Sequence, residues 1–315
     1  MSNYIISTDA CANLPKKLID KYDIPVVPMP FSLNEPIGEK SVTPLGLVKK
    51  TEYKRVDYVS NKTNMSMHEF YSKLANGAVP LTSQANATVI SEYLEPYLKE
   101  GKDVLHISFS SGMSGMYNSA CIAVKELREK YPNRKIIVVD SLSGGGGEGL
   151  AVLDAYKAME EGKSIEDAAS YVEGEKLKYR HYFTVGDIKF IAKSGRISSF
   201  QELIGTLLGI TIILGIDSEG KVYPAAKVRG KKKVVRKMLE LFEDNKGDKS
   251  VDFAIMSHGD SEEEIKELGG ILQDEFPEVK NIDYDYVNML VGCNSGPGSL
   301  ALFFKGTDRT FIQNK

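Results

Sequence analysis

Hydroxyl side chains gather in a glycine-containing turn in the first half of the chain. The segment 107–120 reads ISFSSGMSGMYNSA, in which an apolar run ends near Ser110 and Ser111 and a helical pattern begins near Ser114. Hydroxyls and free backbone N–H groups at the start of a helix bind anions, although the same residues often only cap the helix. A serine nucleophile elbow would require Gly-x-Ser-x-Gly, and Met116 occupies the place of the last glycine. The turn therefore predicts an anion site or a cap, and a hydrolase is a minor hypothesis.

Three more polar clusters occur elsewhere in the chain. Residues 82–84 are Thr-Ser-Gln, residues 193–198 contain Arg196 after a glycine, and residues 292–298 contain Asn294 in a turn rich in glycine. Each has an ordinary structural explanation, namely a helix cap, a solvated arginine and a tight turn. Taken one at a time, none of them indicates a function.

A run of glycines offers the main alternative function. Gly144-x-Gly146-x-x-Gly149 follows an apolar run and opens a helical pattern, as the dinucleotide-binding fingerprint requires. The run follows a late strand instead of the first one, and four adjacent glycines satisfy many templates. A dinucleotide-binding oxidoreductase that uses residues 144–149 is therefore the alternative, and a cofactor titration followed by absorbance tests it.

Composition and charge argue against several other classes of protein. The formal net charge of -3 over 315 residues disfavours a nucleic-acid partner, because such domains are usually strongly basic. The four histidines are isolated, so a metal site is not expected. No other cofactor is expected apart from the dinucleotide of the alternative function. The start of the chain lacks a signal-peptide pattern, and the longest mainly apolar run, residues 203–216, is too short for a transmembrane segment. With only three scattered cysteines as well, the chain is expected to be cytoplasmic.

Short apolar runs alternate with helical patterns through the first half of the chain. Strands are predicted at residues 3–8, 104–109 and 136–139, and each is followed by polar residues and then by a helix. Strands alternating with helices predict a parallel sheet covered on both faces, that is, a three-layer α/β/α arrangement. Ligands bind such sheets beyond the carboxyl ends of the strands, where the hydroxyl-rich turn lies.

The length of the chain predicts two domains, because single hydrophobic cores usually stop growing below about 300 residues. A polar stretch precedes Ser164, which is a good cap for a new helix. We therefore expect a first domain at residues 1–163 and a second α/β domain at residues 164–315. The polar segment at about 34–64 has little periodicity and is expected to be an excursion from the first domain.

Taken together and in order, the polar clusters resemble the motifs of the DegV family of bacterial fatty-acid-binding proteins. The resemblance runs from Asp9 to Phe304, which is nearly the whole chain. Each motif is short, but seven motifs in the order of the family are specific. The matching segments are Asp9-Ala10, Thr82-Ser83-Gln84, residues 110–120, Asp140-Ser141, residues 194–198, residues 227–233 and residues 294–298.

The resemblance implies a two-domain DegV-like fold, with a parallel α/β/α first domain and a mixed-sheet second domain, and a carrier instead of an enzyme. Such a carrier buries the acyl chain of a long-chain fatty acid and presents the carboxyl group to a fatty acid kinase. It would thus belong to fatty acid metabolism and phospholipid synthesis. Thr82 and Ser114 are expected to hold the carboxylate. The positions expected in or near this head-group site are Thr82, Ser83, Ser111, Ser114, Arg196 and Asn294.

The sequence departs from the family pattern around the head group. Asn294 replaces the histidine of the family's closing turn, and Met113 and Met116 replace Leu and Thr on either side of Ser114-Gly115. An amide can donate a hydrogen bond to a carboxylate but cannot carry the positive charge of histidine. Head-group chemistry is therefore expected to be weakened or altered.

Physical chemistry separates the roles of the two ends of such a ligand. Burying a methylene yields roughly 0.8 kcal/mol, so a tail of about 14 contributes on the order of 10 kcal/mol before ordering costs. A hydroxyl hydrogen bond to a charged group adds only about 1.5 to 3 kcal/mol, which is enough to orient the head. Candidate tail contacts are residues 203–216 and the pair Phe190-Ile191.

A basic segment at residues 227–237 stands out on this acidic chain. Such a segment is usually a solvated helix face, but it could also steer an acidic protein partner. By analogy with the family, Arg229 is expected to dock the kinase. A regulatory domain without any ligand is the third class considered, and native mass spectrometry would identify it by the absence of a bound acid.

Overall fold

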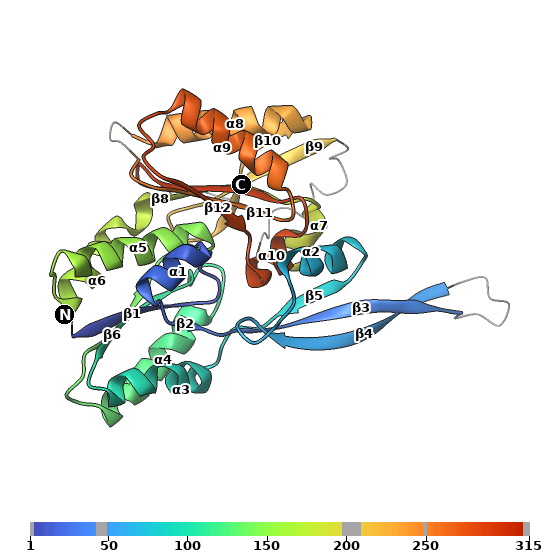
Figure 1. The fold of residues 1–315 in the computed structure, drawn as a ribbon. Coiled ribbons are helices and arrows are strands. Elements are labelled where there is room, and N and C mark those ends of the chain that lie inside the picture. The colour runs from blue at the N-terminus through green and yellow to red at the C-terminus, as the bar shows by residue number, and fades with distance from the viewer. Residues whose placement is uncertain (1–2, 42–48, 197–208, 248–250, 311–315) are drawn as a thin grey trace.

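The computed structural model describes residues 3–41, 49–196, 209–247 and 251–310. Two large β-sheets and a projecting hairpin make up its β-structure, with helices between and around the sheets (Figure 1). Among the described residues, no helix is both long enough and apolar enough to cross a membrane.

The first sheet is parallel, with the strand order β2-β1-β6-β7. Thr8 lies opposite Ile107, and Ser108 lies opposite Asp140, so the carboxyl ends of three strands meet at one edge. The strands are β1 (Tyr4–Asp9), β2 (Val26–Val27), β6 (Asp103–Ser108) and β7 (Ile136–Asp140). The three strands predicted at residues 3–8, 104–109 and 136–139 are therefore confirmed to within one residue.

Helices cover both faces of the first sheet. Ile5 contributes to the core under α3 and α4, whereas Ile6 contributes to the core under α5 and α6, because successive strand residues point to opposite faces. Figure 1 shows these two helix layers on opposite sides of β1 and β6. The helices are α1 (Lys16–Tyr22), α3 (Ala87–Lys99), α4 (Met116–Lys130), α5 (Gly146–Glu160) and α6 (Ile165–Glu175). The predicted three-layer arrangement is confirmed.

The second sheet is mixed, with the strand order β10-β9-β8-β13-β11-β12. The pair β11 and β12 is parallel, and the other neighbours are antiparallel. Helices α8 (Lys231–Asn245) and α9 (Glu262–Glu275) cover its outer face (Figure 1). The strands are β8 (Tyr179–Thr184), β9 (Ile210–Ile216), β10 (Val222–Arg229), β11 (Ala254–His258), β12 (Ile282–Tyr286) and β13 (Leu300–Lys305). A short 3-10 helix, η1 (Lys176–Lys178), precedes β8.

Helix α5 lies between the two sheets, and glycines at its start allow this close packing. A Cβ atom on Gly146 would overlap the ring of Phe303 in β13, and one on Gly147 would overlap the ring of His181 in β8. Gly145, which precedes the helix, has φ 58° and ψ -137°, a conformation that is essentially restricted to glycine. The glycine run thus allows α5 to pack closely against the second sheet, and this packing joins the two halves of the molecule.

The division into domains at residue 163 remains a prediction. Helix α6 follows that position, yet its residues Ile165 and Val172 share a buried core with Leu105 of β6 and Val139 of β7. We therefore propose that the first domain extends through α6.

Small elements close the gap between the sheets on one side. Helix α10 (Met289–Ser295) packs against α2 (Met67–Ala75), α7 (Ile188–Lys193) and β5 (Val79–Thr82). Phe70 and Tyr71 of α2 share a core with Leu290 and Cys293 of α10.

The segment predicted as an excursion forms a long hairpin that projects from the body of the molecule (Figure 1). It consists of β3 (Pro30–Ser41) and β4 (Lys49–Val59). On its other side, β3 pairs with β5 only over residues 31–34. Beyond that point the hairpin is a two-stranded ribbon.

Candidate ligand-binding site

A cavity of about 360 Å³ lies between the first and second sheets. Loops after β1, β5, β6 and β7 contribute to its wall, as do the inner face of the second sheet and helices α7 and α10. Its apolar wall residues are Met29, Phe109, Met113, Phe183, Ile191, Ile216, Val222, Val287, Leu290, Val291, Ala301 and Phe303. The cavity is therefore suited to an apolar ligand.

Five of the six predicted head-group residues line this cavity. They come from separate segments: the end of β5, the turn before α4, the segment after α7, and α10. The five residues are Thr82, Ser83, Ser114, Arg196 and Asn294. Polar groups that are far apart in the sequence thus converge on one apolar space.

Arg196 is the only residue with a charged side chain among the described residues that line the cavity. Its Nε donates to the backbone carbonyl of Met113 at 3.1 Å, and its Nη1 donates to Oδ1 of Asn294 at 3.1 Å. A guanidinium has five N–H donors, so further donors remain for an anion. One cation in an otherwise uncharged, largely apolar space favours a ligand with one negative charge.

Asn294 holds Arg196 in place through its side-chain amide. While Oδ1 accepts from Arg196, Nδ2 donates to the backbone carbonyl of Leu290 at 3.1 Å. Both ends of the amide are therefore engaged within the protein. The sequence suggested that Asn294 could donate to a ligand carboxylate, whereas in the structure it acts on the cation that faces the cavity.

Ser114 both supports a helix and faces the cavity. Its Oγ accepts a hydrogen bond from the backbone N–H of Met116 at 3.2 Å, at the start of α4. An accepting hydroxyl still has its own O–H to donate. The capping and ligand-binding interpretations of this serine are therefore compatible.

The two hydroxyl clusters are brought together by a close approach between chain segments. A Cβ atom on Gly115 would lie 2.6 Å from Oε1 of Gln84, so the glutamine amide lies directly against this glycine. Nε2 of Gln84 in turn donates to Oγ of Ser119 at 2.8 Å. This contact joins the Thr82-Ser83-Gln84 segment to the start of α4.

Ser111 lies apart from the other predicted site residues. Its side chain is exposed and is not part of the cavity wall. Its backbone N–H donates to Oδ1 of Asp140 at 3.1 Å. Ser111 is therefore the least supported of the six predicted positions.

Two buried acids lie beside the cavity instead of in its wall. Burial raises the pKa of Asp9 to about 6, although its carboxylate accepts from the N–H groups of Cys11 and Phe109. Burial and the charge of Asp9 raise the pKa of Glu148 well above its ordinary value. Oε1 of Glu148 accepts from Thr8 at 2.8 Å, and Oε2 has no hydrogen-bond partner among the described residues. These acids support the loops that form the cavity.

The expected tail contacts are only partly in the described structure. Ile191 and Ile216 line the cavity. Phe190 does not line it and packs against Gly296 instead. Residues 203–208 lie outside the described residues.

Sequence reasoning missed much of the cavity wall. Gln84 adjoins Thr82 and Ser83 and belongs to the same Thr-Ser-Gln motif, so the sequence indicated that it lies near the site. His181 and Ser257, by contrast, lie within strands of the second sheet, where nothing in the local pattern distinguishes them from core residues. Burial and the charge of Arg309 keep the pKa of His181 well below its ordinary value, so this ring contributes no cation.

The sequence predicted a basic surface over residues 227–237, but some of these basic side chains form ion pairs in the structure. Arg229 and Lys233 are exposed, and no ion pair is seen for either among the described residues. Arg236 pairs with Glu275 at 2.6 Å, and Lys237 pairs with Glu240 at 2.8 Å. Val234, Val235, Met238, Leu239 and Phe242 of this helix are buried.

The fold and the site define a class of protein. Two α/β halves enclose a largely apolar cavity whose polar end carries hydroxyls and one guanidinium. Within the described residues, no group of three side chains could hold a metal ion. These are the features of a protein that encloses an amphiphilic small molecule.

The chain belongs to the DegV family. The family model described as "Uncharacterised protein, DegV family" matches residues 50–306. A DegV domain-containing protein of Clostridium perfringens is 34% identical over 307 residues, which cover 97% of this chain and 98% of that protein. The predicted family is thereby confirmed.

Solved structures of the family share this fold. A DegV lipid-binding protein from Thermotoga maritima is 26% identical, with a TM-score of 0.78 over 98% of this chain and 100% of that chain. DegV of Bacillus subtilis, described as a fatty-acid-binding protein, is 26% identical, with a TM-score of 0.75 over 98% of this chain and 100% of that chain. The comparisons give no support to the oxidoreductase alternative. The glycines on which it rested, Gly144, Gly146 and Gly149, pack against Phe109, Phe303 and Leu14.

Proposed function

We propose that this protein is a fatty-acid carrier that encloses the acyl chain in the cavity between its sheets. The observation that carries the proposal is the cation of Arg196 in the same cavity wall as Thr82 and Ser114, a wall whose other described residues are uncharged and whose surface is mostly apolar. The lipid-binding and fatty-acid-binding relatives support it.

Each part of the cavity has a role in this proposal. The apolar wall supplies affinity, since each buried methylene is worth roughly 0.8 kcal/mol. Thr82, Ser83 and Ser114 donate hydroxyl hydrogen bonds to the carboxylate, and Arg196 balances its charge. Asn294 positions Arg196 through the hydrogen bond of 3.1 Å.

We further propose that the protein acts as a carrier for a partner kinase and carries no catalytic residue itself. The exposed Arg229 at the end of β10 is the proposed contact with that partner. A basic surface attracts an acidic partner and raises the rate of association. A cytoplasmic location, predicted from the sequence, would place the carrier where it meets the kinase.

Titration of the delipidated protein with oleate, followed by calorimetry, tests the proposal. Thr82→Ala and Ser114→Ala should each weaken binding by roughly tenfold or more, because each removes a hydrogen bond to a charged group worth about 1.5 to 3 kcal/mol. Ser111→Ala is the matched control, since this serine lies outside the cavity wall, and it should leave the affinity unchanged. Absence of oleate binding to the wild-type protein, or equal effects of all three substitutions, would contradict the proposal.

A further inference from the structure

The outer part of the hairpin has little to stabilise it within one chain. We use "arm" for residues 35–41 of β3 and 49–57 of β4, where β3 has no further pairing with β5. The side chains of residues 49–55 are all exposed, including Tyr53 with 47% of its surface accessible. A two-stranded ribbon in water is marginally stable at best, so a third strand would stabilise it.

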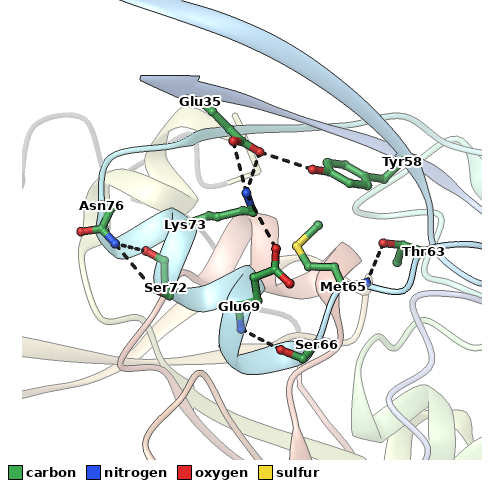
Figure 2. Close-up of polar contacts among 9 residues, drawn as sticks. All are labelled: Glu35, Tyr58, Thr63, Met65, Ser66, Glu69, Ser72, Lys73 and Asn76. Atoms are coloured by element: carbon green, nitrogen blue, oxygen red, sulfur yellow. Dashed lines mark hydrogen bonds and ion pairs between the residues drawn. The ribbon is translucent and has the colours of Figure 1, made fainter. Parts of the chain in front are cut away.

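The root of the arm, by contrast, is firmly attached to the body (Figure 2). Nζ of Lys73 in α2 donates to both carboxylate oxygens of Glu35, at 3.1 and 3.2 Å, and the hydroxyl of Tyr58 donates to Glu35 at 3.3 Å. Tyr58 also stacks on Phe31, with ring centroids 5.1 Å apart, and Phe31 contacts Phe70 edge to face. The arm therefore leaves the body in a defined direction and holds its outer edge away from it.

The outer edge of this sheet is β4, because β4 pairs with β3 alone in the order β4-β3-β5. Proteins usually protect such an edge with lysines, which repel a second copy. The charged residues of β4 are of both signs: the bases are Lys49, Lys50, Lys54 and Arg55, and the acids are Glu52 and Asp57. Within the chain, Lys49 pairs with Glu39 at 3.3 Å and Arg55 with Asp57 at 2.8 Å, at exposed positions where such pairs contribute little. The charge pattern therefore decides whether two copies repel or attract each other.

Symmetry limits the ways in which two β4 edges can pair. When a twofold axis relates two antiparallel edge strands, both strands present the same face of the sheet. One residue must then face its own copy, and the axis lies midway between the two. With the axis at Tyr53, Glu52 lies opposite Lys54 of the other copy, and Lys49 lies opposite Asp57. Each of these opposite-charge pairs occurs twice. Opposite charges on directly facing residues stabilise a sheet, and like charges destabilise it.

Other registers give fewer opposite-charge pairs. An axis at Glu52, Lys54 or Arg55 places two like charges opposite each other. An axis at Thr51 or at Val56 avoids facing like charges within residues 49–59, but each gives only one kind of opposite-charge pair. The register centred on Tyr53 gives two kinds and therefore the most opposite-charge pairs.

We propose that the β4 edge of the arm is a homodimerisation surface, at which two copies of this chain pair antiparallel about Tyr53. The paired arms form one continuous sheet in the order β5-β3-β4-β4-β3-β5. The partner is thus a second copy of the chain, and the surface is separate from the cavity.

Charge-reversal variants of the full chain test this register by sedimentation and light scattering over a range of concentrations. The wild type should dimerise. Glu52→Lys makes both members of each central facing pair lysines, and Lys54→Glu makes both glutamates, so each variant should raise the dimer dissociation constant at least tenfold. An equimolar mixture of the two variants should form a heterodimer, because each facing pair is then of opposite charge. The double variant E52K/K54E should dimerise like the wild type.

Binding of oleate serves as the folding control, because neither residue lines the cavity. A wild type that stays monomeric while it binds oleate would overturn the proposal. So would variants that dimerise as strongly as the wild type, or a mixture of folded variants that stays monomeric. If mixing the two variants restores a dimer, misfolding cannot be the reason that each variant alone is monomeric, since each chain in the mixture still carries its substitution.

Discussion

Asn294 holds a charged side chain at the cavity wall although its own amide carries no charge. Here the amide accepts from Arg196 at 3.1 Å and so fixes a permanent cation at the cavity wall. We therefore infer that the proposed head-group site carries one positive charge, supplied by Arg196.

This arrangement predicts coupled effects of the two residues on fatty-acid affinity. Arg196→Ala should weaken oleate binding by roughly 10- to 100-fold, because a hydrogen bond to a charged group is worth about 1.5 to 3 kcal/mol. Asn294→Ala should weaken it less, since the cation remains but loses its orientation. In a double-mutant cycle measured by calorimetry, Asn294→Ala should have little further effect once Arg196 is absent. Fully additive losses would show that Asn294 contacts the ligand itself.

The buried acid Glu148 predicts a pH dependence of stability. Its folded-state pKa is raised well above the ordinary value, so folding favours the protonated form. Its contribution is fully present below the ordinary pKa and is lost as pH rises toward the folded pKa, by up to about 1.4 kcal/mol per pH unit. Glu148→Gln cannot ionise and should therefore gain free energy of unfolding relative to the wild type as pH rises from 5 to 8. Urea unfolding at several pH values measures this difference, and a constant difference would contradict the assignment.

The individual site residues were predictable to the extent that they lie in local motifs. Thr82, Ser114 and Arg196 each follow a strand or a helix at a recognisable turn, and the structure brings all three to one cavity. Ser257 and Phe303 lie inside strands, where a residue that faces a cavity and one that faces the core look alike in sequence. Whether such a residue faces the cavity depends on which distant segment of the chain lies opposite it. The local sequence pattern does not contain this information.

At the scale of elements, the glycines at the start of α5 predict a specific cost of adding a methyl group. Gly147→Ala should lower the free energy of unfolding by about 1 to 3 kcal/mol, because the added Cβ would overlap His181 between tightly packed layers. Gly174→Ala in α6 is the matched control, since no atom lies within 4 Å of its added Cβ, and helix propensity should then raise stability by up to about 1 kcal/mol. Thermal and urea unfolding compare the two variants. Equal effects would refute a packing role for Gly147.

The predicted elements are those with a strong hydrophobic period. The buried parallel strands β1, β6 and β7 are nearly continuous apolar runs, which explains why their positions were predictable. The arm strands β3 and β4 have few apolar residues outside the root, so the segment lacks a clear strand pattern. Strand β12 reads Ile-Asp-Tyr-Asp-Tyr at the edge of its sheet and was not predicted, although its residues alternate as in a half-buried strand.

At the scale of the whole molecule, two halves enclose the cavity and several contacts tie them together. Oγ of Ser110 donates to the carbonyl of Gly220 at 2.8 Å, and Nδ2 of Asn13 donates to Oγ of Ser257 at 3.1 Å. The ligand would lie at this junction, so its binding should stabilise both halves together.

The proposed docking of a kinase predicts separate effects on the complex and on the ligand. Arg229→Ala should leave oleate affinity unchanged and weaken the complex with the partner kinase, mainly by slowing association at low salt. Arg236→Ala is the matched control, because that side chain is already paired with Glu275 at 2.6 Å, and it should have a smaller effect. Surface plasmon resonance at two salt concentrations measures both. A loss of oleate binding by Arg229→Ala would contradict the assignment.

The most direct test of the central claim is to identify what the cavity holds when the protein is purified without denaturation. Organic extraction followed by mass spectrometry should recover close to one long-chain fatty acid per wild-type chain. The variant with Thr82→Ala, Ser114→Ala and Arg196→Ala combined should retain much less. Recovery of no acid from a folded wild type that also fails to bind added oleate would contradict the account.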